Sequence, residues 1–167
     1  MKILGIDPAL LKTGYGLIQD DNNQILLIEA GLISTESKQL ISKRLAKVYE
    51  EVCSLIDKFK PKVMALEKLY VHYRHPTTAY LLGQVKGILT LLCAQKKIEL
   101  YEYNPTSIKK AIVGRGQASK YQVQRIVAEL LHLKKLPKYP DITDALAVAI
   151  AHSYISKVKE KFPFLKR

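Results

Sequence analysis

The chain has 167 residues, enough to bury a hydrophobic core as one domain, and 48% of them are hydrophobic and 25% charged. Its 27 Lys and Arg residues outnumber its 15 Asp and Glu residues, which gives a formal net charge of +12 at pH 7. This charge favours a polyanionic partner, nucleic acid before an acidic membrane surface, and no apolar run approaches the ~18 residues of a membrane span.

The first part of the chain predicts a three-stranded meander, a helix and a fourth strand. Apolar runs at residues 3–6, 14–20 and 24–34 are separated by turn signals, the first turn holding Pro8 and Gly14. Apolar residues at helical spacing then predict a helix over about 38–60. The apolar run that follows, Val63-Met64-Ala65-Leu66, should lie parallel to an earlier strand after a right-handed crossover.

The second part predicts one strand among helices. A long helix over about 76–97 leads to a strand over about 98–103. Three further helices follow, over about 105–112, 119–132 and 141–157. The order βββαβαβααα predicts an α/β fold with a mixed sheet. We expect a single domain over residues 1–158 and a short basic tail over 159–167.

Two predicted buried strands end in an acidic residue. Asp7 follows Ile3-Leu4-Gly5-Ile6, and Glu67 follows the strand predicted at residues 63–66. The carboxyl ends of strands form the ligand crevice of open α/β sheets, so we expect the two carboxylates to converge there. Either residue taken alone could be ordinary, Asp7 as an Asp-Pro turn residue and Glu67 as an exposed strand end.

The last predicted helix carries a second pair of acids. Asp141 and Asp144 are three residues apart and therefore lie on one face of that helix. Taken alone, this pair is more typical of a helix N-cap with its capping-box partner. Every residue from 145 to 151 is apolar, however, which indicates a helix packed closely onto the rest of the protein.

Acids that meet against an apolar wall would repel one another unless cations neutralised them. Oxygen-only ligands of this kind suit Mg²⁺, for which Mn²⁺ can substitute. Acids around magnesium in so basic a chain indicate metal-assisted phosphodiester cleavage, with two ions per site. His152 lies eight residues beyond Asp144, ~12 Å along a helix, which is too far to share the ion.

Four segments of the chain strongly resemble the RuvC-type Holliday-junction resolvases of bacteria, which are crossover junction endodeoxyribonucleases. These segments are Ile3-Leu4-Gly5-Ile6-Asp7-Pro8, Thr13-Gly14-Tyr15-Gly16, Ala65-Leu66-Glu67-Lys68-Leu69-Tyr70 and Asp141-Ile142-Thr143-Asp144-Ala145-Leu146-Ala147. The resemblance covers essentially the whole chain. It implies a ribonuclease-H-like fold, with a five-stranded mixed sheet flanked by helices, and a homodimer. It also implies magnesium-dependent resolution of four-way DNA junctions by paired symmetric nicks, in recombination and repair.

The resemblance also implies roles for individual residues. The family's four catalytic and metal-binding acids match Asp7, Glu67, Asp141 and Asp144, and Lys120 matches a basic residue that supports cleavage. The residues expected to bind DNA are Tyr70, Tyr73, Arg74, Lys109, Lys110, Arg115 and Lys120. His72 and His75 are either phosphate contacts or solvated side chains.

Other features of the family carry over as expectations. Gly83-x-x-x-Gly87 lies in the long helix that, by resemblance, helps to form the dimer, although packing within one chain would explain it equally well. Branch-migration helicase subunits are expected partners, and the location is expected to be cytoplasmic. Ala9 stands where the family usually has a glycine, so the turn after Asp7 cannot rely on a glycine-only conformation.

Competing hypotheses remain at this point. Another nuclease of the same fold could act on RNA–DNA hybrids or on ribosomal RNA precursors. A DNA-binding module that no longer cuts is a second alternative, which the presence of all four acids disfavours. An actin-like phosphotransferase would need a second nucleotide-binding half, for which 167 residues leave no room.

Overall fold

The computed structural model describes residues 1–21, 24–68 and 76–162. The elements follow in the order β1 (Lys2–Asp7), β2 (Lys12–Asp21), β3 (Gln24–Ser34), α1 (Ile41–Phe59), β4 (Val63–Glu67), α2 (Pro76–Lys96), β5 (Glu99–Tyr103), α3 (Pro105–Val113), α4 (Lys120–Leu130) and α5 (Pro140–Lys161). The predicted order βββαβαβααα is confirmed.

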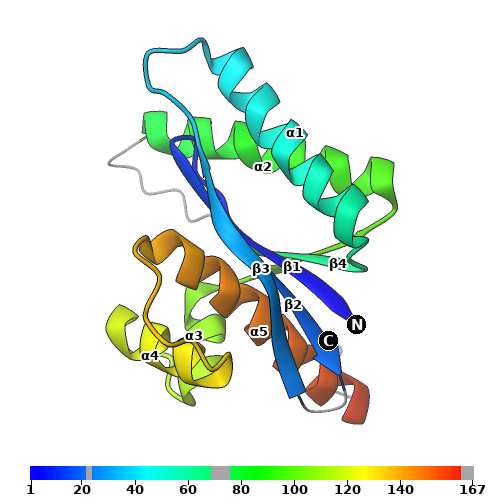
Figure 1. Cartoon of the computed structure of the whole chain (residues 1–167), viewed down its shortest axis with the longest axis vertical. Helices are drawn as coiled ribbons and strands as arrows, with labels where there is room; N and C mark the ends of the chain where they lie inside the picture. The colour runs from blue at the N-terminus through cyan, green and yellow to red at the C-terminus, as the bar shows by residue number, and fades with distance from the viewer. Residues whose placement is uncertain (22–23, 69–75, 163–167) are drawn as a thin grey trace.

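The five strands form one mixed sheet in the order β3-β2-β1-β4-β5 (Figure 1). β2 is antiparallel to β1 and to β3, as a meander requires, whereas β4 is parallel to β1 and to β5. The predicted parallel direction of β4 is therefore confirmed. Ile6 pairs with Leu66, so the next residue of each strand, Asp7 and Glu67, emerges at the same end of the sheet.

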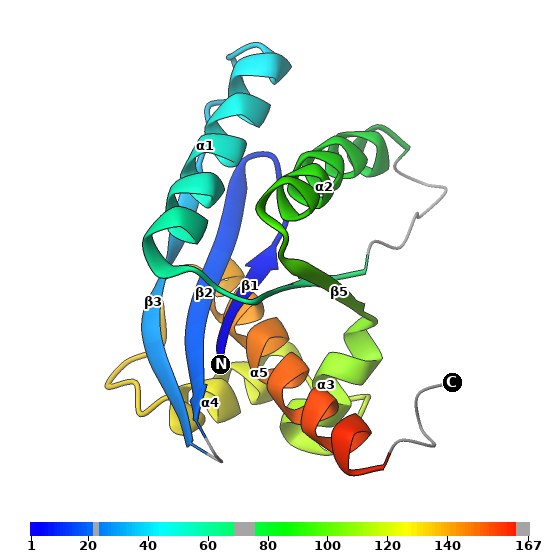
Figure 2. The same ribbon diagram turned by 90° about the vertical axis from the view of Figure 1, so that its right-hand side faces the viewer.

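Helices cover both faces of the sheet, and Figures 1 and 2 show α1 and α2 on one face and α3, α4 and α5 on the other. Side chains alternate between the two faces along a strand. In β1, Ile3 joins the core beneath α5, whereas Leu4 and Ile6 join the core beneath α1 and α2. The same alternation continues to Asp7 and places its side chain on the face that α5 covers.

The backbone of α5 lies directly on the sheet because glycines stand where it crosses β1 and β2. A Cβ added to Gly5 would lie 2.1 Å from the carbonyl oxygen of Ala145, and one added to Gly14 would lie 2.1 Å from that of Asp141. No side chain fits at such a separation. Residues 145–153 of α5 are all buried as a result, which explains why this helix is apolar around its whole circumference.

Two details of the chain differ from the sequence prediction. Gly14 lies within β2, paired with Asp7, rather than in the turn between the strands. Helix α5 runs to Lys161, four residues beyond the predicted end, so the first three residues of the expected tail are helical. Its exposed last turn carries Lys159 and Lys161, whose positive charges interact favourably with the negative end of the helix dipole.

The turn after Asp7 does not need a glycine. Ala9 is not among the described residues that have positive φ, and the turn is held instead by the buried side chain of Thr13. The Thr13 hydroxyl donates a hydrogen bond to the Ala9 carbonyl, and the Ala9 N–H donates to the hydroxyl oxygen at 3.4 Å. The Thr13 side chain thus holds the turn at Ala9 without the left-handed backbone conformation that glycine favours.

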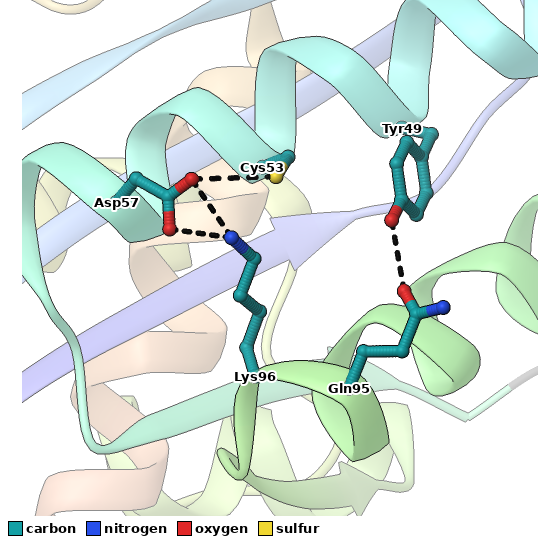
Figure 3. A network of polar contacts seen from close by, with 5 residues as sticks. All are labelled: Tyr49, Cys53, Asp57, Gln95 and Lys96. Carbon is teal, nitrogen blue, oxygen red and sulfur yellow. Dashed lines mark hydrogen bonds and ion pairs between the residues drawn. The ribbon is translucent and has the colours of Figure 1, made fainter.

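Helices α1 and α2 are joined by polar contacts on the sheet face opposite the acids (Figure 3). The Lys96 ammonium donates to both carboxylate oxygens of Asp57, at 2.6 and 2.8 Å, and the Cys53 thiol donates to the same carboxylate. The Tyr49 hydroxyl donates to Gln95 Oε1 at 2.8 Å. These contacts fix how α2 lies against α1 and leave the opposite side of α2 open.

The segment Thr77–Lys96 of α2 is long and apolar enough, by length and composition alone, to cross a membrane, and 22% of it is buried. One such helix is weak evidence, because the core helix of a globular protein passes the same test. Val85, Leu89 and Leu92 of α2 are fully buried in the core beneath α1. The expectation of no membrane contact stays a prediction.

The close approach of α5 to β1 makes Gly5→Ala a sharp test of the fold. We expect the substitution to lower the free energy of unfolding by at least about 3 kcal/mol, because the new methyl group would overlap a backbone carbonyl that cannot rotate away. Urea unfolding followed by circular dichroism measures this. Gly116→Ala is the control: its added Cβ would meet its nearest atom at 3.5 Å, an ordinary contact. Equal stability of the two variants would contradict the packing described here.

Candidate active site

An open cleft of about 360 Å³ lies at the carboxyl ends of β1 and β4. It is lined by Asp7, Glu67, Pro105, Ile108, Lys109, Lys120, Val123, Asp144 and Ala147. The strands contribute two acids to it, α5 contributes a third, and α3 and α4 contribute one lysine each. The sequence prediction that acids from distant segments meet at this edge of the sheet is confirmed for these three acids.

Asp141 does not line the cleft itself. Its backbone carbonyl packs over Gly14, one turn of α5 before Asp144. Its carboxylate is near enough to raise the pKa of both Asp7 and Asp144 by its negative charge. Asp141, the fourth predicted acid, therefore interacts with the other acids through its charge, although it lies outside the lining of the cleft.

The capping explanation for Asp141 and Asp144 is wrong. Helix α5 begins at Pro140, and its N-cap residue is Tyr139, whose side chain makes no capping hydrogen bond. Asp141 lies inside the first turn, and the Asp144 carboxylate pairs with Lys120 of α4. A structural cap does not account for either carboxylate.

Burial and mutual repulsion raise the pKa values of the acids in the cleft. The pKa of Asp7 rises to about 7, first because the group is buried and then because Asp144, Glu67 and Asp141 are near. Burial is also the largest cause of the raised pKa of Glu67 and of Asp144. Such shifts, caused first by burial and then by neighbouring acids, mark this group of carboxylates as a candidate functional site.

Two lysines partly offset the negative charge of the cleft. The Lys120 ammonium lies 2.5 Å from Asp144 Oδ2 and lowers the pKa of that carboxyl, although burial outweighs it. Neighbouring acids raise the pKa of Lys120 itself, against the effect of burial. Lys109, on the α3 wall, favours ionised Glu67 by its charge. Both lysines line the cleft, and their roles in binding DNA and supporting cleavage stay predictions.

The remaining predicted DNA-binding residues lie elsewhere. Lys110 is exposed on α3 outside the cleft, and Arg115 lines a separate hollow of about 650 Å³ beside the start of α4. Tyr70, Tyr73 and Arg74 fall outside the described residues, as do His72 and His75. The structure therefore leaves these five predictions untested.

The donors in the cleft suit a divalent metal by chemistry and charge. They are carboxylate oxygens, the ligands that Mg²⁺ and Mn²⁺ prefer, and burial followed by mutual repulsion raises their pKa values. Over residues 1–21, 24–68 and 76–162, no three acid, His or Cys side chains are yet close enough together to hold an ion.

The apolar part of the cleft and one buried polar contact escaped the sequence prediction. Ile108 and Val123 form walls from α3 and α4, and only their helical spacing could have suggested an inward position. His152 is buried away from the cleft, where Nδ1 lies 2.8 Å from the Tyr103 hydroxyl and burial lowers its pKa. This agrees with the expectation that His152 does not share an ion with the acids.

A mixed sheet in this order, with acids gathered at the ends of its central parallel strands and beside a helix of the opposite layer, defines a ribonuclease-H-like nuclease. Comparison with known proteins narrows this class. Residues 3–152 match the family model of the crossover junction endodeoxyribonuclease RuvC. The chain belongs to this family.

Individual relatives agree with this assignment. The chain is 43% identical to crossover junction endodeoxyribonuclease RuvC of Pseudothermotoga lettingae, over 97% of this chain and 99% of that protein. It is 42% identical to that of Finegoldia magna, over 95% and 96% of the two chains. The structure of T. thermophilus RuvC in complex with a Holliday junction substrate superimposes with a TM-score of 0.90 at 26% identity, covering 95% of this chain and 96% of that one. The ribonuclease-H-like fold is thereby confirmed.

The raised pKa of Asp7 predicts how the stability of the metal-free protein depends on pH. The pKa is about 7 in the folded chain and ~3.9 when unfolded, so the folded chain binds this proton more tightly. The stability from this group is complete below about pH 4 and is lost as the pH rises through 7. With a metal chelator present, Asp7→Asn should therefore be more stable than the original chain by about 1–3 kcal/mol at pH 8, and less so at pH 5.

Urea unfolding at the two pH values measures this difference. Asp57→Asn serves as control, because Asp57 lies on exposed α1 with its pKa lowered by Lys96, and its replacement should bring no gain at pH 8. If Asp7→Asn stabilised the chain equally at both pH values, the pKa of Asp7 would not be raised.

Proposed function

We propose that this protein resolves four-way DNA junctions by two symmetric nicks, in DNA recombination and repair. The observation that carries the proposal is the cleft in which Asp7, Glu67 and Asp144 meet between two lysines. A carboxylate cluster flanked by cations is the arrangement that metal-assisted phosphodiester cleavage needs. Membership of the crossover junction endodeoxyribonuclease family supports the substrate, and a relative was solved with a Holliday junction.

The proposed cofactor is Mg²⁺, or Mn²⁺ in its place, with two ions per site held by Asp7, Glu67, Asp141 and Asp144. Bound there, the ions would supply an activated water and neutralise the charge of the leaving oxygen. The chain contributes rigid placement: Asp7 and Glu67 end paired strands, and the acids of α5 stand on a helix locked to the sheet. Lys109 and Lys120 would hold the scissile phosphate against these acids.

Basic residues around the cleft would hold the junction arms. Lys110 and Arg115 continue the positive surface from the α3 wall, and each phosphate that they neutralise would release counterions. Lys134 and Lys135, with Tyr121 and Arg125, line a groove of about 580 Å³ along α4. Tyr70, Tyr73 and Arg74 follow Glu67 in the sequence, and the tyrosines would stack on unpaired bases.

A homodimer is the proposed assembly, because two cuts at symmetric positions require two sites related by a two-fold axis. The open side of α2 is the proposed interface. It exposes the large side chains Tyr80 and Leu91, and an added Cβ at Gly83 or Gly87 would meet no atom within 4 Å. A second copy of α2 could therefore approach closely over the two glycines.

The remaining expectations follow from the family. A single domain over residues 1–158, a cytoplasmic location and branch-migration helicase subunits as partners complete the proposal. No observation in the cleft favours RNA–DNA hybrids or ribosomal RNA precursors as the substrate. Parallel assays with a synthetic four-way junction, a hybrid duplex and a structured RNA decide between these substrates, since the proposal requires paired symmetric nicks in the junction alone.

Asp144→Asn should abolish junction cleavage without loss of binding. We expect the cleavage rate to fall by about 10³-fold or more, because the site loses a charged ligand that the reaction needs. Junction binding should persist or tighten, since a negative charge near the phosphate is removed. Cleavage rates and gel-shift affinities in Mg²⁺ measure both quantities.

The control for this substitution is Asp57→Asn, which changes the same chemical group on the opposite face of the sheet. Its cleavage should match that of the original chain. A variant at position 144 that cut normally but melted at a lower temperature would mean that Asp144 has a structural role only.

Leu91→Glu should convert the dimer into a monomer. Leu91 is 55% exposed on the open side of α2, and a buried charge without a partner would destabilise the proposed interface. Size-exclusion chromatography with light scattering reports the mass. Leu26→Glu is the matched control, because Leu26 is 45% exposed but lies on edge strand β3. The interface is refuted if the first variant stays dimeric or the second dissociates too.

A further inference from the structure

The shortest ion pair in the cleft joins two helices that carry proposed catalytic groups. The Lys120 ammonium, at the first residue of α4, lies 2.5 Å from Asp144 Oδ2 of α5. The Asp144 side chain is 21% exposed and that of Lys120 is 61% exposed. The acid is thus held inside the cleft, whereas the lysine reaches it from solvent.

The start of α4 is fixed, but the lysine side chain is not. Ser119 and Gln122 form a reciprocal capping box, with hydrogen bonds of 2.8 and 3.2 Å between side chain and backbone. This anchors the backbone beside Lys120 at the rim of the cleft. The long, mostly exposed side chain can therefore leave Asp144 by rotation of its own bonds, without any movement of α4.

The ammonium lies against a carboxylate that is a proposed metal ligand. One lone pair of Asp144 Oδ2 accepts the short hydrogen bond from the ammonium, which leaves fewer sites on this carboxylate for a cation. The two positive charges would also repel each other at such a distance.

We infer that Lys120 is a built-in counter-ion that competes with the divalent cation for Asp144 and is freed for the DNA phosphate when the cation binds. This inference rests on the proposed metal-dependent function. It adds a coupling: a phosphate that draws Lys120 away from Asp144 strengthens metal binding, and metal binding strengthens the phosphate contact by the same factor. The metal-free site is then held together by an internal cation and keeps a low affinity for metal until substrate arrives.

Lys109 allows direct competition to be separated from the general field of a positive charge. It lines the same cleft from α3 and carries the same charge, and it forms no ion pair with an acid anywhere in the part of the chain that the structure describes. Removal of Lys109 changes the field alone. Removal of Lys120 changes the field and also releases Asp144.

The experiment measures the affinity of the protein for Mn²⁺ in the absence of DNA. The electron paramagnetic resonance signal of the free ion reports how much Mn²⁺ remains unbound. Lys120→Gln should bind Mn²⁺ about three- to tenfold more tightly than the original chain, the range expected for loss of a partly exposed ion pair. Lys109→Gln should change the affinity by less than about twofold, because its charge is screened and makes no contact. Lys120→Arg, which keeps the charge, should bind as the original chain does.

A double-mutant cycle tests whether Lys120 acts through Asp144. In an Asp144→Asn background the further change Lys120→Gln should no longer tighten Mn²⁺ binding, because the contested carboxylate is gone. Melting temperatures with chelator and with Mn²⁺ give a second readout: Lys120→Gln should gain more on addition of metal than Lys109→Gln does.

Each outcome bears on a different proposal. Equal tightening by Lys120→Gln and Lys109→Gln, or an undiminished effect in the Asp144→Asn background, overturns the competition while the proposed function stands. An unchanged affinity in Lys120→Gln overturns it as well. Failure of the original chain and of all variants to bind Mn²⁺ overturns both the competition and the proposed metal-dependent function.

Discussion

The direct contact between α5 and the sheet is the constraint on which the rest of the structure depends. Gly5 and Gly14 leave no side chain between the helix backbone and the strands, so α5 cannot slide or tilt without meeting β1 or β2. Because α5 is locked, Asp141 and Asp144 at its start have a fixed height above the ends of β1 and β4. The acids thus converge because their backbones are packed together, and such packing holds them more rigidly than contacts between flexible side chains would.

This convergence destabilises the protein when no metal is bound. Burial and repulsion raise the pKa of Asp7 to about 7, a sign that the folded chain resists a full set of negative charges here. The lysines of α3 and α4 relieve part of the repulsion and lie where a phosphate would also need them. Electrostatic strain and substrate recognition are therefore properties of the same few side chains.

The cleft and the proposed dimer interface lie on opposite faces of the sheet. The face under α3, α4 and α5 carries the cleft. On the other face, α1 and α2 are joined by the Asp57–Lys96 ion pair and the Tyr49–Gln95 hydrogen bond (Figure 3). These contacts lie on one side of α2 and leave its other side open, away from the acids. Chemistry and proposed assembly therefore use different layers, and a change at the open side of α2 need not distort the cleft.

The order of the elements and the acids that end the strands can be predicted from the sequence, because apolar periodicity and the residue that breaks it are local properties. The sequence also indicated that the helix of Asp144 is buried, from seven consecutive apolar residues at 145–151. The roles of Lys109 and Lys120 came from resemblance alone. Only the tertiary structure shows that Gly14 lies in a strand, that the Thr13 side chain holds the turn at Ala9, and that Lys120 contacts Asp144. The first depends on the pairing of β1 with β2 and the last on the packing of α4 beside α5, and no local apolar pattern encodes either contact.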